Sequence, residues 1–148
     1  MFTKLNRVIQ RLEWRVGCKD RACQQVQQQA DGLQSDIRAA RQQRQQMQQH
    51  LNMLQLSGAT TLASLLAFRG QQATIQRRLA EVELQLTDKQ QQHEQLMQQL
   101  GSLRAERNLL HRKREKLTQH TQRWRQQQRQ EMQRRQDTET EEQRHWQI

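Results

Sequence analysis

Proline and tyrosine are absent from this chain of 148 residues, and aromatic residues make up 3% of it. Hydrophobic residues amount to 32%, below the share that a globular domain of this length uses. Such a chain lacks the apolar side chains for one thick core, so it is either disordered or built as a thin apolar layer between long helices. The absence of proline and the abundance of Gln, Arg, Leu, Glu and Ala favour helices.

Long hydrophobic runs are also missing. No stretch approaches the roughly 20 apolar residues of a membrane span, and residues 1–16 contain no continuous apolar segment of a secretory signal. Cys18 and Cys23 would lie on different faces of a helix, so they cannot bridge each other, and no His or Cys stands at metal-ligand spacing beside them. We therefore expect a soluble intracellular protein with reduced thiols, no metal and no cofactor.

Sequence motifs of enzymes are absent as well. The chain contains no Gly-rich phosphate loop, no nucleophile elbow and no pair of carboxylates that a pocket could hold. Its five histidines are scattered through polar segments. Since a thin helical layer offers no concave pocket, we expect no enzyme activity.

Two long segments carry apolar residues at alternating steps of four and three. A strict period of 3.5 residues implies a supercoil against a partner helix, and a disordered Gln-rich chain would not keep this phase. The first seam is Leu5, Ile9, Leu12, Val16, Lys19, Cys23, Val26, Ala30, Leu33, Ile37, Ala40, Arg44, Met47, Leu51 and Leu54. The second seam is Leu65, Phe68, Gln72, Ile75, Leu79, Val82, Leu86, Lys89, His93, Leu96, Leu100, Leu103, Arg107, Leu110, Arg114, Leu117, Thr121 and Trp124.

The stretch LSGATT separates the two seams, so the simplest partner of each seam is the other half of the same chain. Gly58 can end the first helix in a left-handed conformation, and Thr60 or Thr61 can cap the second helix. The sequence thus predicts an all-α fold, a two-helix antiparallel coiled-coil hairpin with an overhanging C-terminal helix. We expect one elongated domain over 1–148, with helices over about 3–56 and 62–143 and a turn over about 57–61.

The register of this hairpin can be argued from the sequence, because a-type positions face d-type positions in an antiparallel pair. If Leu54 faces Leu65, each polar residue of one seam meets an apolar residue of the other and can extend outward. A slip of one heptad would bring Lys19 opposite Arg107, two like charges within the seam. We therefore predict the first register, which leaves the second helix without a partner after about residue 116.

The net charge of +10 is compatible with nucleic acid, an anionic membrane surface or an acidic protein as partner. Positive residues concentrate at the end that carries both termini, where Trp14, Trp124 and Trp146 also avoid the paired part of the seams. Trp and Arg are favoured anchors of interfaces. Either the tryptophans are exposed there by chance, or this end docks onto an acidic receptor through an attraction that salt weakens.

The turn end carries apolar residues of its own. Leu62 and Leu66 lie off the seam, and Phe68 and Arg69 follow them. This group is either a local hydrophobic cap that closes the hairpin or an exposed second binding site.

Three stretches carry a resemblance to a known family. They are LQLSGATTLASLLAFRG at 54–70, ATIQRRLAEVELQL at 73–86, and TQRW at 121–124 leading into the acidic TETEE. With the overall layout, they resemble the central stalk proteins of type III secretion ATPases, in the SpaM/InvI branch, which are relatives of the FliJ and YscO stalks. The resemblance in length and layout covers nearly the whole chain.

The resemblance implies a non-catalytic stalk in the cytoplasm, at the base of a bacterial secretion apparatus. Its terminal end would enter the pore of the hexameric secretion ATPase, its turn end would face the export gate protein, and secretion chaperones are further candidate partners. The ATPase-facing residues would be Arg7, Arg11, Trp14, Arg15, Arg114, Arg123 and Trp124. The gate-facing residues would be Leu62, Leu65, Leu66, Phe68 and Arg69.

The residues alone are compatible with two other functional hypotheses. A basic coiled coil could bind nucleic acid, although the chain has no recognised basic-region motif and few interleaved aromatic residues. The seams could also pair between chains in a structural homodimer, which a mass measurement would separate from the hairpin.

Overall fold

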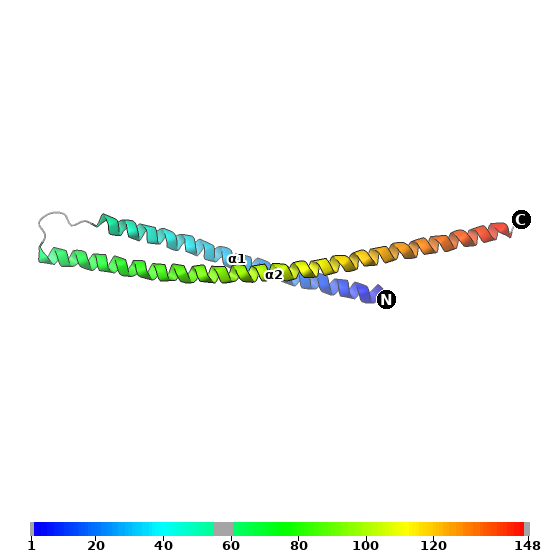
Figure 1. Ribbon diagram of the computed structural model, residues 1–148, viewed down its shortest axis with the longest axis horizontal. Helices are drawn as coiled ribbons and strands as arrows, with labels where there is room; N and C mark the ends of the chain where they lie inside the picture. Colours follow the sequence, from blue (N-terminus) through cyan, green and yellow to red (C-terminus); the bar gives the residue numbers. More distant parts are fainter. Residues whose placement is uncertain (1, 55–60, 147–148) are drawn as a thin grey trace. The chain divides into compact units, whose positions relative to one another are not determined.

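The computed structural model describes residues 2–54 and 61–146, and this part of the chain contains two long helices and no strand. Helix α1 spans Phe2–Met53 and helix α2 spans Leu62–His145 (Figure 1). The prediction of an all-α antiparallel hairpin is confirmed. Neither helix, over its described residues, combines the length and the apolar character needed to cross a membrane.

The chain divides into two compact units, and both helices contribute to each. Unit 1 comprises Met1–Ala22 and Leu103–Ile148, so it contains both termini. Unit 2 comprises Cys23–Ser102 and contains the connection between the helices. Since burial in both units follows the heptad pattern, the same sequence rule builds each of them.

Burial confirms the two predicted seams. In each unit every seam residue is buried or half-buried, with Trp124 as the exception at 41% exposed. The best-buried apolar residues of unit 2 include Ala30 and Leu100, and those of unit 1 include Val16 and Leu110. Apolar area is removed from water along a narrow stripe, which is why an apolar content of 32% suffices.

Unit 2 has a small packed cluster at its centre. Ile37 and Ala40 of α1 and Leu86 of α2 form it, and Leu33 packs against it. Small alanines in the seam let the two helices approach, while the larger Leu and Ile side chains fill the space between them.

The start of α2 is capped as the sequence predicts. The Thr61 hydroxyl accepts a hydrogen bond from the Ser64 backbone N–H at 3.3 Å, which satisfies one of the free donors at the helix N-terminus. The Ser64 hydroxyl donates in turn to the Thr61 carbonyl at 2.8 Å. At the other side, α1 ends at Met53, earlier than the predicted end near residue 56. The predicted role of Gly58 falls outside the described residues.

The predicted register is wrong by one heptad. Lys19 forms an ion pair with Glu106, and the Arg107 guanidinium donates to the Asp20 carboxylate at 3.2 Å. These contacts place Lys19 opposite Arg107. This is the register that the sequence analysis excluded because it brings two like charges together. Taken alone, the two seam cations would repel each other, but Asp20 and Glu106 flank them and neutralise them across the helix pair.

The corrected register changes where the overhang begins. It places Leu5 opposite Thr121, which is 7% exposed and whose hydroxyl donates to the Leu117 carbonyl at 2.7 Å. Because the Thr121 hydroxyl bonds to a carbonyl of its own helix, it can be buried without a hydrogen-bond partner on α1. All described residues after Thr121 are exposed, and we call residues 122–145 of α2 the overhang.

Reversing one ion pair tests this register. Lys19→Glu places two carboxylates together, and Glu106→Lys gathers cations around Arg107, so each change should lower the free energy of unfolding by about 0.5–1 kcal/mol. The two changes together restore an opposite-charge pair and should recover most of that loss. Urea unfolding followed by circular dichroism measures all three variants.

Losses that simply add in the double variant would contradict the observed pairing. Arg38→Glu, a change at an exposed residue of unit 2, serves as the control for a general effect of charge.

Candidate functional site

A basic and aromatic surface lies on α1 in unit 1. Arg7, Gln10, Arg11 and Trp14 line one shallow depression. Their spacing of three, four and seven residues places them on one face of a helix, away from the seam. Trp14 is 67% exposed, so its indole ring is available to a partner. An exposed Trp beside two Arg side chains is a typical anchor for a protein surface that bears carboxylates.

The other predicted residues of this end do not all join that surface. Arg15 is exposed on the adjoining face of α1, whereas Arg114 is half-buried in the second seam, with a guanidinium nitrogen 3.2 Å from the His111 ring. Arg123 and Trp124 lie in the overhang. The observed register places residue 112 opposite Trp14, so Trp124 is more than three helical turns further along α2. The structure therefore does not bring the predicted set together on one surface.

Charge is very unevenly divided between the units. Unit 1 holds 18 Lys and Arg against 9 Asp and Glu, a net charge of +9, while unit 2 holds 7 against 6, a net charge of +1. Nearly all of the excess of +10 thus belongs to the unit that also carries the exposed tryptophans. A field of this size attracts acidic partners and keeps the unit soluble.

Sequence reasoning missed two kinds of feature in unit 1: the ion pairs across the helices and two exposed apolar residues off the seam. The ion pairs of Asp20 and Glu106 could have been foreseen, because each acid directly adjoins a seam cation in the sequence. Val8 and Leu109 are further apolar residues of unit 1 that are exposed. Their signal in the sequence is weak, since each is a single apolar residue that lies off the heptad pattern and beside seam residues.

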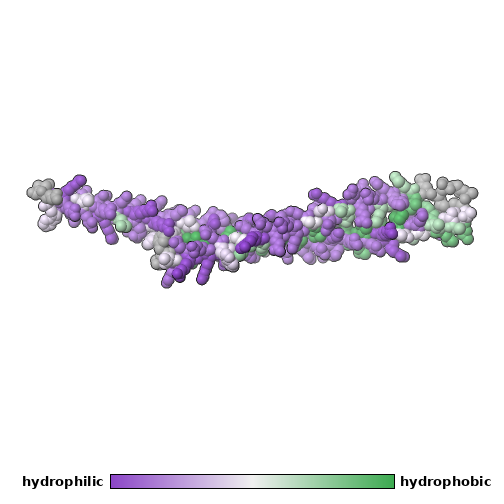
Figure 2. All heavy atoms as spheres, turned by 180° about the vertical axis from the view of Figure 1, so that it is seen from behind, coloured by the Kyte–Doolittle hydropathy of each residue, from purple (hydrophilic) through white to green (hydrophobic). Residues whose placement is uncertain are grey.

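The turn end of unit 2 has an apolar surface. Leu62 and Leu66 are 75% and 61% exposed, Leu65 and Phe68 are half-buried, and Arg69 is exposed; we call these five residues the tip surface. Met53, at the end of α1, is also exposed. Figure 2 shows apolar colouring at this end of unit 2, over both the end of α1 and the start of α2. The structure thus brings the predicted gate-facing residues together on the first turns of one helix.

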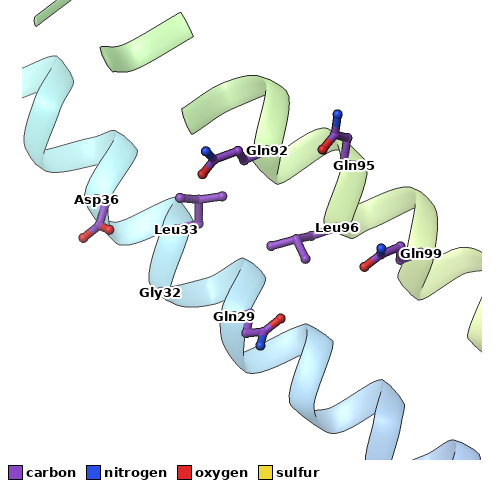
Figure 3. Close-up of a pocket in the computed structure, with 8 residues that line it drawn as sticks. All are labelled: Gln29, Gly32, Leu33, Asp36, Gln92, Gln95, Leu96 and Gln99. Atoms are coloured by element: carbon purple, nitrogen blue, oxygen red, sulfur yellow. The ribbon is translucent and has the colours of Figure 1, made fainter. Parts of the chain in front are cut away.

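A second depression lies between the helices of unit 2. Leu33 and Leu96 point toward the space between α1 and α2, and glutamines with Asp36 surround them (Figure 3). Its lining offers amides and one carboxylate, without a cluster of catalytic groups. Among the residues that the structure describes, no three His, Cys, Asp or Glu side chains group closely enough to hold a metal ion.

Comparison with known proteins identifies one family. Residues 3–144 match the family described as Salmonella surface presentation of antigen gene type M protein. Neither the curated proteins nor the solved structures gave a significant match. The matched range covers all of unit 2 and nearly all of unit 1. The chain therefore belongs to the surface presentation of antigen type M (SpaM) family and is a protein associated with type III secretion.

Proposed function

We propose that this chain is the non-catalytic central stalk of a type III secretion export apparatus. Unit 1 binds in the pore of the hexameric secretion ATPase, and the tip surface of unit 2 binds the export gate protein. The observation that carries the proposal is the concentration of charge, +9 of +10, in the same unit as the exposed tryptophans. Membership of a secretion family supports a partner within the apparatus. The protein then works in the cytoplasm, at the base of that apparatus.

The arginine-rich surface suits a contact that is made and remade. One stalk inside a ring of six subunits cannot satisfy six equivalent interfaces at once, so it binds one subunit state in preference to the others. Long Arg side chains, such as Arg7 and Arg11 beside Trp14, can reach carboxylates in different geometries. Long-range attraction by the basic unit also speeds the encounter with an acidic pore.

The tip surface suits a different kind of partner. Leu62 and Leu66 remain exposed in a chain that has few apolar residues, and an exposed apolar group is a common mark of a protein interface. Unit 2 has almost no net charge. Its contact with the gate protein therefore depends mainly on apolar burial, whereas the contact of unit 1 with the ATPase depends on charge. Secretion chaperones are further candidate partners of either surface.

Nucleic-acid binding is the second candidate, because the same charge of unit 1 would attract a phosphate backbone. A binding experiment distinguishes this candidate function from the first. A gel shift at physiological salt that shows tight binding to DNA or RNA, together with no binding to the ATPase, would favour it.

A charge reversal tests the ATPase contact. In Arg11→Glu with Arg15→Glu, two exposed cations of unit 1 become anions, which repel an acidic pore. We expect binding to the cognate ATPase, and the stimulation of its ATP hydrolysis, to weaken about tenfold or more at low salt. The matched control is Arg38→Glu with Arg41→Glu in unit 2, which changes net charge equally and should bind nearly as the parent does.

Equal losses in these two variants would show that net charge alone matters, and no loss in either would refute the assignment of unit 1 to the ATPase.

A polar substitution tests the tip surface. Leu62→Asp with Leu66→Asp removes the two most exposed leucines of that surface without touching the seam. We expect binding to the export gate protein and secretion in cells to fall at least tenfold, because apolar burial is lost and charges are placed in the contact. Stimulation of the ATPase should stay at the level of the parent chain.

Leu84→Asp is the control for this pair, since Leu84 is an exposed leucine of unit 2 outside the tip surface. A secretion defect of equal size in Leu84→Asp, or none in the tip variant, would argue against the assignment of the gate.

A further inference from the structure

The apolar seam of unit 2 does not favour one register over its neighbour. A slip of one heptad, to the register with Leu54 opposite Leu65, would exchange apolar for polar partners at some positions and polar for apolar partners at others. The residues that would lose an apolar partner are Val26, Ala30 and Met47. Those that would gain one are Leu33, Ile37 and Leu54. Gains and losses are therefore balanced, while Ala40 and Leu51 keep apolar partners in both registers.

The polar residues beside the seam of unit 2 also do not favour one register over the other. Gln85, Gln92 and Gln99 recur at intervals of seven residues along α2, and the last two border the depression between the helices (Figure 3). A slip of one heptad places a glutamine amide where another was. A register is specified when successive positions along a helix need different partners. Because these glutamines are alike, residues elsewhere in the chain must determine the register.

The contacts that do distinguish the registers lie in unit 1. Lys19 with Glu106 and Asp20 with Arg107 form ion pairs in the observed register, and a slip of one heptad would move the partners apart by about 10 Å. All four side chains are partly exposed, so each pair contributes little and is sensitive to its surroundings.

We propose that the hairpin has a second register, displaced by one heptad, and that the charges of Lys19, Asp20, Glu106 and Arg107 select between the two. The shift would alter both ends of the chain together. Leu65 and Phe68 would come to face Leu54 and Leu51, which covers part of the tip surface. In unit 1, Leu117 and Thr121 would leave Ile9 and Leu5 and join the overhang.

The shift links the two candidate surfaces through a discrete two-state element. An acidic partner whose carboxylates compete for Lys19 or Arg107 in unit 1 would weaken these ion pairs and favour the register in which the tip surface is partly covered. The biological meaning of that link rests on the proposed function, but the existence of the second register does not.

Disulfide formation in the isolated chain tests the second register. Cys18 and Cys23 are first replaced by serine. Ala40→Cys with Leu86→Cys then reports the observed register, since these two residues lie in one packed cluster, and Ala40→Cys with Leu79→Cys reports the displaced one. The initial rates of oxidation at low protein concentration give the ratio of the two registers.

Removal of the ion pairs should change this ratio. With Asp20→Asn and Glu106→Gln, we expect the displaced register to gain about five-fold relative to the observed one, which corresponds to about 1 kcal/mol. Thr121→Leu adds an apolar partner for Leu5 in the observed register alone, and should shift the ratio in the opposite direction. Circular dichroism verifies that each variant remains helical.

The matched control is Glu131→Gln with Asp137→Asn, which neutralises two acids of the overhang and should leave the ratio unchanged. The proposal is overturned if the Ala40–Leu79 disulfide does not form above the level of a mismatched pair such as Ala40–Lys89, or if neither variant moves the ratio. The disulfide test uses the isolated chain, without ATPase or gate protein. A negative disulfide result would therefore not contradict the proposed function, and negative results in the binding tests would not contradict the second register.

Discussion

The pairing of two narrow apolar seams within one chain is the constraint on which the rest of this structure depends. Each helix alone is too polar to be stable through packing, because its apolar residues occupy a single stripe. Antiparallel pairing removes both stripes from water at once and leaves every other face of the helices free. The exposed arginines, the tryptophans and the leucines near the turn are then available for partners, since the seam does not need them.

Much of this arrangement can be predicted from the sequence, because the positions of apolar residues in a heptad repeat indicate which side chains are buried between the helices. The pattern predicts both seams residue by residue, including polar members such as Arg44 and His93, and it predicts Thr60 or Thr61 as the cap, of which the structure has Thr61. The pattern does not predict the register, because the register depends on side chains beside the seam: Asp20 and Glu106 make the juxtaposition of Lys19 and Arg107 favourable. For the candidate site, exposure of Trp14 follows from its heptad position, whereas the separation of Trp124 from it follows from the register alone.

In the proposed function, surfaces instead of pockets make the contacts with partners. Unit 1 combines Arg7, Arg11 and Trp14 on one face and holds almost the whole net charge, while unit 2 presents apolar side chains at the start of α2. Two surfaces of different chemistry would let the proposed stalk bind two unlike partners without competition between them. Both helices contribute to both units, so the proposed change of register would alter the two surfaces together.

The most direct test of the account is the mass and disulfide state of the chain with Ala30→Cys and Leu96→Cys, after serine replaces Cys18 and Cys23. These two seam positions face each other if the chain pairs with itself in the observed register. The account predicts that oxidation at low concentration gives an intrachain disulfide in a protein that sediments with the mass of one chain, 17.9 kDa. Disulfide-linked dimers without an intrachain product would contradict it.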